Sequence, residues 1–270
     1  MQVQRVTFSV PKEGYRPGEW EDGAADGPLG GGRRGDPPIF RFAVADGATE
    51  AYESQRWVGL LIGSFMSPDP AGGASAPELE RGSMNAWFKA MQEQWWAAMP
   101  ATGDYIEQLK IRQGTLATFA GGELRGLDTP APRWQAIALG DSVLFHVRDG
   151  RLVEHFPPLH SADFDSTPEG ISTLPERLGQ MSEQLLFREG QLAPGDLIFV
   201  ATDAFAQWMI TRLEDGDQNL WRLLGEMVHP SLFSQLVRAQ RRAMAMKDDD
   251  VTLMRIRLLR RPVSTVVVCL

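Results

Sequence analysis

The chain has 270 residues, of which 43% are hydrophobic, and a formal net charge of -8. This hydrophobic share supplies a substantial core and excludes a disordered chain, while the acidic balance argues against a general binder of nucleic acid or membrane surfaces. The single cysteine, Cys269, excludes a disulfide framework and disfavours a zinc–thiolate site.

Residues 1–10 alternate like a β-strand and lack the apolar stretch of a secretory signal. No apolar run approaches the roughly 20 residues that a membrane-spanning helix needs. Together with the scarcity of cysteine, these features predict a cytoplasmic protein that binds neither membrane nor nucleic acid.

Residues 11–38 are rich in glycine and proline and are predicted to form a loop. A phosphate-binding loop is one interpretation of Gly30–Gly32. A flexible connection is favoured, because neither a Lys-Ser/Thr pair nor a helical pattern follows.

Two amphipathic helices are expected next, over residues 50–66 and 84–99. In the first, apolar residues recur at helical spacing: Val58, Leu61, Ile62 and Phe65. The second carries an aromatic and methionine stripe: Met84, Trp87, Phe88, Met91 and Trp95. Core packing is favoured over an aromatic binding face, because helical spacing alone accounts for the stripe.

From residue 109 the hydrophobic period shortens to that of β-strands. Strands are predicted over 109–119, 134–139, 143–147 and 152–156, then over 197–201 and 251–258. Asp149-Gly150 predicts a hairpin between two of these strands. Two further helices are expected near 218–228 and 231–246. This order indicates an α+β class with largely antiparallel pairing, in one domain over 1–270 with a core of about 1–258 and a short tail over 259–270.

Aspartates stand at the ends of several apolar runs. Asp46, Asp141 and Asp203 each close a run, and the cluster Asp248–Asp250 opens the last one. Carboxylates gathered at one sheet edge repel one another unless a cation lies among them, and carboxylate oxygens suit Mg²⁺ or Mn²⁺. The histidines show no zinc-binding spacing, which disfavours a zinc hydrolase: His146, His155, His160 and His229.

In its order of motifs the chain resembles the metal-dependent (type 2C-like, PPM) Ser/Thr protein phosphatases, with features of bacterial members. The matching blocks run from about residue 20 to 258: Glu21-Asp22-Gly23-Ala24, Val44-Ala45-Asp46-Gly47, Leu139-Gly140-Asp141-Ser142 with Arg148–Leu152, Gly195-Asp196-Leu197 through Ala201-Thr202-Asp203, and Lys247 to Thr252. One Asp-Gly pair is usually only a turn, whereas the ordered set is specific.

The resemblance implies a four-layer α-β-β-α sandwich of two antiparallel sheets, with two Mn²⁺ or Mg²⁺ ions at one end. Asp46 would bridge both ions, with the Gly47 carbonyl on one. Asp203 and Asp249 would hold the first ion. Glu21 and Asp22 would act on the other side, directly or through water, and Asp141 would mark a third metal site. A metal-bridging water would then attack the phosphorus.

The chain departs from the family pattern at the groups that handle phosphate and proton. Ala48 stands where many members have a histidine general acid, and Glu50 is a candidate replacement, against a simple helix-start carboxylate. Pro17 stands at the usual position of the phosphate-binding arginine, so Arg16 would have to serve instead; an ordinary surface arginine is the alternative. We therefore expect Asp22, Arg16 and Glu50 as the catalytic candidates.

The leading hypothesis is a phosphatase of phosphoserine and phosphothreonine in bacterial signalling, acting as a monomer on a phosphoprotein, with a cognate Ser/Thr kinase as a partner. Residues 157–175 lie where the family has a flap beside its cleft. A catalytically impaired binding module is the alternative, favoured by Ala48 and the displaced arginine. A small-molecule phosphatase on the same site, and a β-sandwich with incidental aspartates, are further alternatives.

Overall fold

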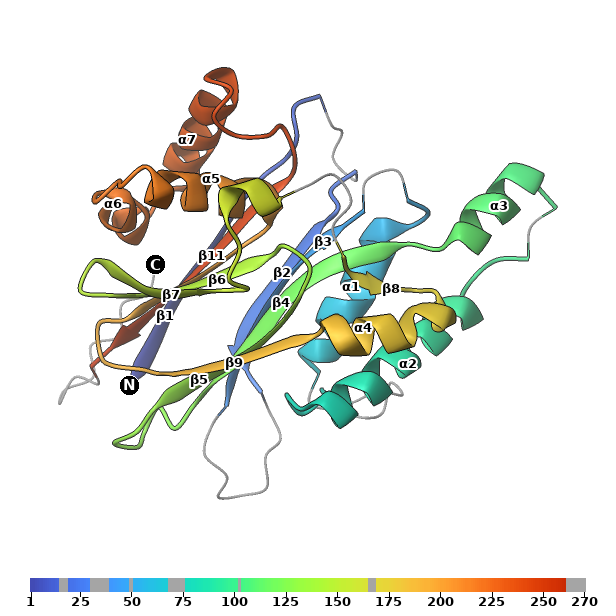
Figure 1. Cartoon of the computed structure of the whole chain (residues 1–270), viewed down its shortest axis with the longest axis horizontal. Coiled ribbons are helices and arrows are strands. Elements are labelled where there is room, and N and C mark those ends of the chain that lie inside the picture. Colours follow the sequence, from blue (N-terminus) through green and yellow to red (C-terminus); the bar gives the residue numbers. More distant parts are fainter. Residues whose placement is uncertain are drawn as a thin grey trace.

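Two antiparallel β-sheets lie face to face, and helices cover both outer faces (Figure 1). The computed structural model describes residues 1–14, 19–29, 39–48, 51–67, 76–101, 103–164 and 169–260. The expected α+β sandwich with four layers is confirmed.

The first sheet has five strands in the order β1-β11-β10-β6-β7. Its members are β1 (Gln2–Val10), β11 (Val251–Leu259), β10 (Leu197–Ala201), β6 (Val143–Arg148) and β7 (Arg151–Phe156). The first and last strands of the fold pair directly, with Gln2 opposite Leu259. The hairpin between β6 and β7 turns at Asp149 and Gly150, both of which have positive φ angles, as predicted from this dipeptide.

The second sheet follows the order β2-β3-β4-β5-β9, with the short β8 paired to β4. Its members are β2 (Asp22–Pro28), β3 (Phe40–Gly47), β4 (Leu116–Arg125), β5 (Arg133–Leu139), β9 (Leu186–Gln191) and β8 (Ile171–Ser172).

Each sheet has its own set of helices. The second sheet packs against α1 (Ser54–Phe65), α2 (Arg81–Ala97) and α4 (Leu178–Gln184). The first sheet packs against α5 (Asp203–Glu214), α6 (Leu220–Glu226) and α7 (Pro230–Arg242). Helix α3 (Tyr105–Gln113) projects from the α2 side (Figure 1). Two short 3₁₀ turns, η2 (Ser161–Asp163) and η3 (Pro175–Arg177), lie on either side of β8.

The strands alternate between the two interfaces. In β10, Ile198 and Val200 face the other sheet, whereas Phe199 and Ala201 face the helices. The stripe predicted on the second helix is buried against the second sheet, from Met84 to Trp95. Its interpretation as core packing is therefore confirmed.

Two sequence predictions were wrong. Residues 11–38 are not all loop, because β2 lies within them. Residues 109–113 belong to α3 rather than to a strand. There the Asp104 side chain accepts hydrogen bonds from two backbone N–H groups at the helix start, and Gly114, with φ 67°, ends the helix. Helices α4 and α5 and strands β8 and β9 had no prediction at all.

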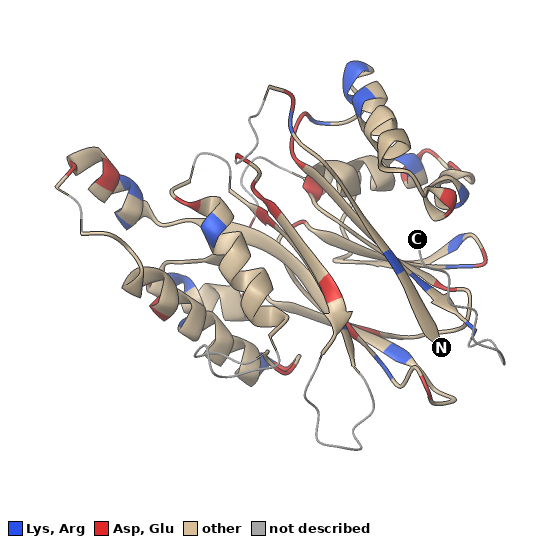
Figure 2. Cartoon of the chain, turned by 180° about the vertical axis from the view of Figure 1, so that it is seen from behind, with Lys and Arg blue, Asp and Glu red and all other residues tan. Residues whose placement is uncertain are grey.

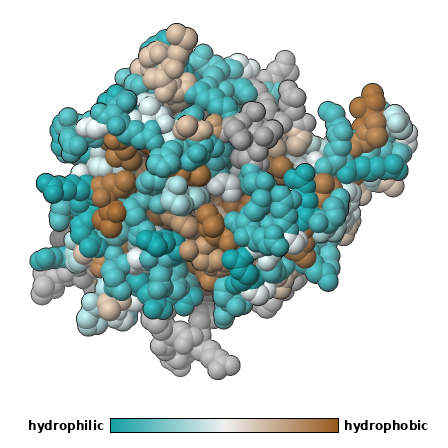
Figure 3. Space-filling model, in the orientation of Figure 1, coloured by the Kyte–Doolittle hydropathy of each residue, from teal (hydrophilic) through white to brown (hydrophobic). Residues whose placement is uncertain are grey.

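On the face shown in Figure 3, hydrophilic residues predominate and apolar groups lie at separate places. Ile106 and Leu109 are exposed on the projecting α3. Within the described residues, no helix combines the length and the apolar character needed to cross a bilayer.

A buried ionic network fixes the turn before β10. Asp196 is fully buried and accepts hydrogen bonds from Arg148 Nε at 2.8 Å, Arg148 Nη2 at 2.7 Å and the Ala193 N–H at 2.8 Å. The ring of His146 lies 2.9 Å from the same carboxylate, and Trp134 Nε1 donates to the other ring nitrogen at 3.3 Å. Burial by itself would raise the pKa of Asp196, but Arg148 and His146 outweigh it and lower that pKa.

Candidate functional site

Acidic residues lie near one end of the two sheets (Figure 2). Asp22 begins β2, and the antiparallel register of β2 and β3 places it directly opposite Asp46. Helix α1 packs closely on β2 because β2 has small residues there. A Cβ on Gly23 would lie 2.4 Å from Val58 of α1, so only glycine allows this helix to pack here.

The first sheet brings its carboxylates to the same end. Asp203 is the first residue of α5, directly after β10, and Asp249 lies just before β11. Thr202 joins the two sheets, because its hydroxyl donates to Asp22 Oδ2 at 3.0 Å and accepts the Thr252 N–H at 3.0 Å. Residues from the two sheets therefore form one acidic group.

The charges of this group act on one another. Burial raises the pKa of Asp46 most, and the negative charges of Asp22, Asp203, Asp141 and Asp249 raise it further. Burial also raises the pKa of Asp22, with Asp250 and Asp203 adding to it and hydrogen bonds from Thr252 and Thr202 opposing it. The anionic forms of Asp22 and Asp46 are thus unfavourable without added positive charge.

One cation lies between two of these carboxylates. The ammonium of Lys247 is 3.0 Å from Asp203 Oδ2 and 2.9 Å from Asp249 Oδ2. Burial opposes the charged amine, but Asp203 and Asp249 outweigh it and raise the pKa of Lys247. Lys12 lies farther away, 4.0 Å from Asp249 Oδ1.

Glu21 is held beside the site by local contacts. Its Oε1 accepts from the Ser54 hydroxyl at 2.6 Å, and its carbonyl accepts the Gly47 N–H at 3.2 Å. The Asp250 carboxylate accepts both the Glu21 N–H and the Lys12 N–H at 2.9 Å. Glu21 and Gly47 thus lie next to Asp22 and Asp46.

Asp141 is buried after β5, and its negative charge contributes to the raised pKa of Asp46. The next residue, Ser142, shares a 2.8 Å hydrogen bond with Thr118, which is register-paired with Asp46. Two other candidates, Arg16 and Glu50, lie outside the described residues.

Several solved structures share this architecture. PppA of Pseudomonas aeruginosa, described as a regulatory component of the T6SS, is 15% identical with a TM-score of 0.56, over 96% of this chain and 99% of its own. The catalytic domain of the Ser/Thr phosphatase PstP, in complex with two manganese ions, is 14% identical with a TM-score of 0.55 over the same shares. The S. agalactiae Ser/Thr phosphatase is 13% identical with a TM-score of 0.58, over 95% of this chain and 100% of its own.

The chain has the fold of the PPM-type phosphatases. The sequence resemblance to that fold is confirmed at the level of architecture. No protein-family model matches the chain, and no curated protein matches it. At these identities the PPM fold is what the comparisons establish.

The donors of the site are of the right kind for a PPM metal centre, since carboxylate oxygens suit Mg²⁺ and Mn²⁺. Asp22 Oδ1 is buried and has no hydrogen-bond partner among the described residues. As the side chains stand, however, no group of three His, Cys, Asp or Glu residues in the described ranges is arranged to hold a metal ion. Two of the carboxylates, Asp203 and Asp249, are instead in contact with the Lys247 ammonium.

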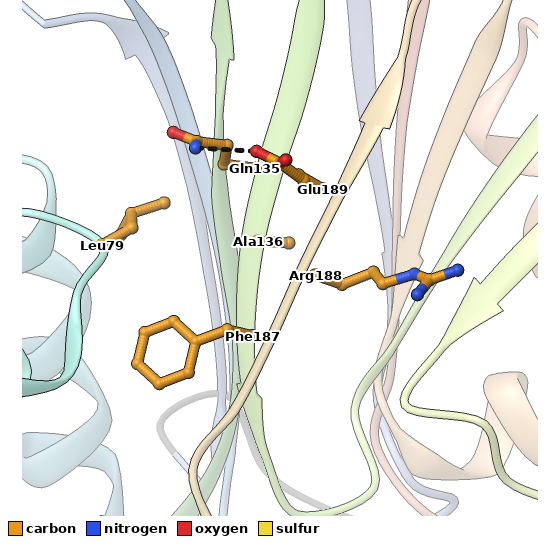
Figure 4. A pocket seen from close by; sticks show the side chains of 6 residues that line it. All are labelled: Leu79, Gln135, Ala136, Phe187, Arg188 and Glu189. Atoms are coloured by element: carbon orange, nitrogen blue, oxygen red, sulfur yellow. Dashed lines mark hydrogen bonds between the residues drawn. The ribbon is translucent and has the colours of Figure 1, made fainter.

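A separate pocket of about 290 Å³ lies over β5 and β9 (Figure 4). Gln135 and Glu189 cross it and pair at 3.2 Å, while Arg188 points away toward β7 and bonds Glu154 at 2.6 Å. These polar groups are therefore already paired with one another or with Glu154. None of the acidic residues described above, such as Asp22 and Asp203, lines this pocket.

Sequence reasoning missed Lys247, Thr202 and Asp250 as parts of the site. Lys247 directly precedes three aspartates, and this adjacency was the only available indication. A lysine beside an acidic turn is usually a solvated surface residue, so the pattern does not distinguish its role.

Proposed function

We propose that the protein is a divalent-metal-dependent phosphatase of phosphoserine and phosphothreonine in proteins. The observation that carries this proposal is the meeting of Asp22, Asp46, Asp203 and Asp249, from both sheets, at one end of a PPM-type fold. Four carboxylates that repel one another are costly to keep together. Lys247 offsets this cost for Asp203 and Asp249, but the raised pKa values of Asp22 and Asp46 indicate that their charges remain unfavourable.

The proposed roles follow the surroundings of each residue. Asp46 and Asp22, with Glu21 and the Gly47 carbonyl beside them, would hold one cation, and Asp203 and Asp249 would complete the site of another. Asp141 would contribute to a third. When bound, such cations supply positive charge to the phosphoryl oxygens and lower the pKa of a water molecule. The preferred ion, Mn²⁺ or Mg²⁺, is a question for titration.

Substrate handling is assigned to two residues beyond the described ranges. Arg16 would bind the phosphate through its guanidinium, which suits phosphate geometry. Glu50, two residues after Ala48, would protonate the leaving oxygen. We propose a cytoplasmic monomer that acts on a phosphoprotein made by a cognate kinase. Structural neighbours such as PppA support a place in regulation.

A second candidate is a catalytically impaired module that binds a phosphoprotein or kinase. The contact of Lys247 with Asp203 and Asp249 favours it, because an ammonium then neutralises two of the proposed ligands.

Hydrolysis of p-nitrophenyl phosphate in Mn²⁺, Mg²⁺ or EDTA separates the two functions. We expect turnover with metal and none with EDTA, and a loss on the order of a hundredfold in Asp203→Asn. Turnover no faster than that of the Asp203→Asn control would leave the binding module as the function. Phosphopeptides assayed against nucleotides and sugar phosphates then test the substrate class.

A further inference from the structure

We propose that Lys247 is a built-in cation that occupies the position between Asp203 and Asp249 and must leave before a divalent ion can bind this pair. The inference rests on the proposed function only in its choice of competitor, a divalent metal at the acidic end. It makes the Lys247 side chain a gate on metal loading.

The contact geometry supports a resident cation. Lys247 Nζ lies at hydrogen-bond distance from both carboxylates, 3.0 Å from Asp203 Oδ2 and 2.9 Å from Asp249 Oδ2. The other oxygen of Asp203 accepts the Ala204 N–H at 2.5 Å, so Oδ2 is the oxygen left for a cation. An ammonium and a metal ion would therefore compete for the same atoms.

Hydrogen bonds fix the main chain on both sides of Lys247. Before it, the Met244 N–H bonds the Arg241 carbonyl at 2.8 Å, and the Ala245 N–H bonds the Gln240 carbonyl at 3.0 Å, which ends α7. After it, the Asp250 carboxylate bonds two backbone N–H groups of the N-terminal region. Displacement thus requires a rotation of the side chain and no movement of the segment.

The displaced side chain has space to enter. Lys247 lines a cavity of about 480 Å³ together with Trp208, Arg241, Met244 and Asp248, among others. Its side chain is 46% exposed, whereas those of Asp203 and Asp249 are 10% and 17% exposed. The amine therefore reaches the two largely buried carboxylates from the solvent side, and its side chain can rotate toward solvent when a metal ion competes for the same oxygens.

Direct Mn²⁺ binding, measured by isothermal titration calorimetry, tests the gate without any turnover. Lys247→Met keeps the length of the side chain and removes the charge, and we expect Mn²⁺ to bind it about tenfold or more tightly than wild type. Lys89→Met is the matched control, because Lys89 is exposed on α2 and forms a surface ion pair with Glu93 at 3.9 Å, away from the acidic end. The control should bind Mn²⁺ within twofold of wild type.

Equal affinity in wild type and Lys247→Met, or no Mn²⁺ binding by either, would overturn the inference. Tighter binding by Lys247→Met without phosphatase activity would overturn the proposed function alone. Phosphatase activity with equal Mn²⁺ affinities would overturn the inference alone.

A second measurement needs no variant. Lysine acetylation of the wild-type chain, followed by peptide mass spectrometry, compares the rate at Lys247 with the rate at Lys89. We expect Lys247 to react more slowly than Lys89 in EDTA. At saturating Mn²⁺ the rate at Lys247, divided by the rate at Lys89, should rise, because the metal frees the Lys247 amine. A ratio that Mn²⁺ leaves unchanged would mean that metal binds without releasing the amine, against the inference.

Discussion

Strand β10 carries an aspartate at each end, and the two have opposite surroundings. Asp196, before Leu197, is bonded by Arg148, His146 and a backbone N–H, and its pKa is lowered. Asp203, at the other end, accepts the Ala204 N–H and contacts the Lys247 ammonium, but it belongs to an acidic group in which the pKa values of Asp22 and Asp46 are raised. A carboxylate surrounded by donors and cations of its own fold stabilises that fold, whereas carboxylates gathered so closely that their pKa values rise indicate a site for an added cation.

The largest expected effect is at Asp196, the aspartate held by Arg148 and His146. Asp196→Ala should lower the free energy of unfolding by about 3 kcal/mol, because it leaves the Arg148 and His146 donors without their buried acceptor. Urea denaturation measures the change. The matched control is Asp217→Ala, which removes the partner of Arg212 at the surface and should cost about 1 kcal/mol or less. Equal losses of stability in the two variants would contradict a larger role for the buried Asp196 network than for the surface pair of Asp217.

Acid should weaken the same network. Because the pKa of Asp196 is lower in the folded chain than in the unfolded one, its contribution is complete above the unfolded value of about 4. It is lost as pH falls through the folded value. Unfolding measured at pH 6, 4, 3 and 2 should therefore show the stabilities of wild type and Asp196→Asn converging toward low pH. A constant difference would contradict the assignment.

A smaller loss is expected where the two sheets meet. Thr202→Val preserves shape but removes the hydroxyl that donates to Asp22 and accepts the Thr252 N–H. The buried N–H loses its acceptor, and we expect a loss of about 1.5 kcal/mol in the free energy of unfolding. Thr211→Val is a control, since the Thr211 hydroxyl donates to the Gln207 carbonyl of its own helix. A similar small loss in both variants would argue against a special link at Thr202.

The smallest effect should have the opposite sign. In EDTA, Asp46→Asn removes one of several repelling charges and should leave stability unchanged or raise it by about 1 kcal/mol. The same variant should lose metal-dependent hydrolysis. Thermal denaturation in EDTA and the p-nitrophenyl phosphate assay measure the two effects. A destabilisation comparable with that of Asp196→Ala would show that Asp46 is structural.

Much of the fold could be predicted from local patterns. The alternating or continuous apolar runs of β1, β5, β6, β10 and β11 identified these strands, and helical stripes identified α1, α2 and α7. The sequence of β2, DGAADGP, has no apolar pattern, because its strand character comes from pairing with β3. The edge strand β9 is similarly unpatterned, with most of its residues exposed.

The site was predictable only in part, and for a related reason. Asp22, Asp46, Asp141, Asp203 and Asp249 follow or precede strands, so an ordered set of motifs identified them. Their mutual influence at one end of the fold is seen in the raised pKa of Asp46. Lys247 has no such marker, since its contacts depend on the side chain reaching across to α5.

The bonds from Asp250 to the backbone of Lys12 and Glu21 span 238 and 229 positions of the chain. A ribosome adding about 5–20 residues per second needs on the order of 10–50 s to cover such a distance. During that time Asp22 and Asp46 have been synthesised without Asp249, Asp250 or the lysine that accompanies them. A chain with a completed acidic end has therefore been translated at least as far as β11, and an interrupted product carries the N-terminal carboxylates without the partners that would make them a site.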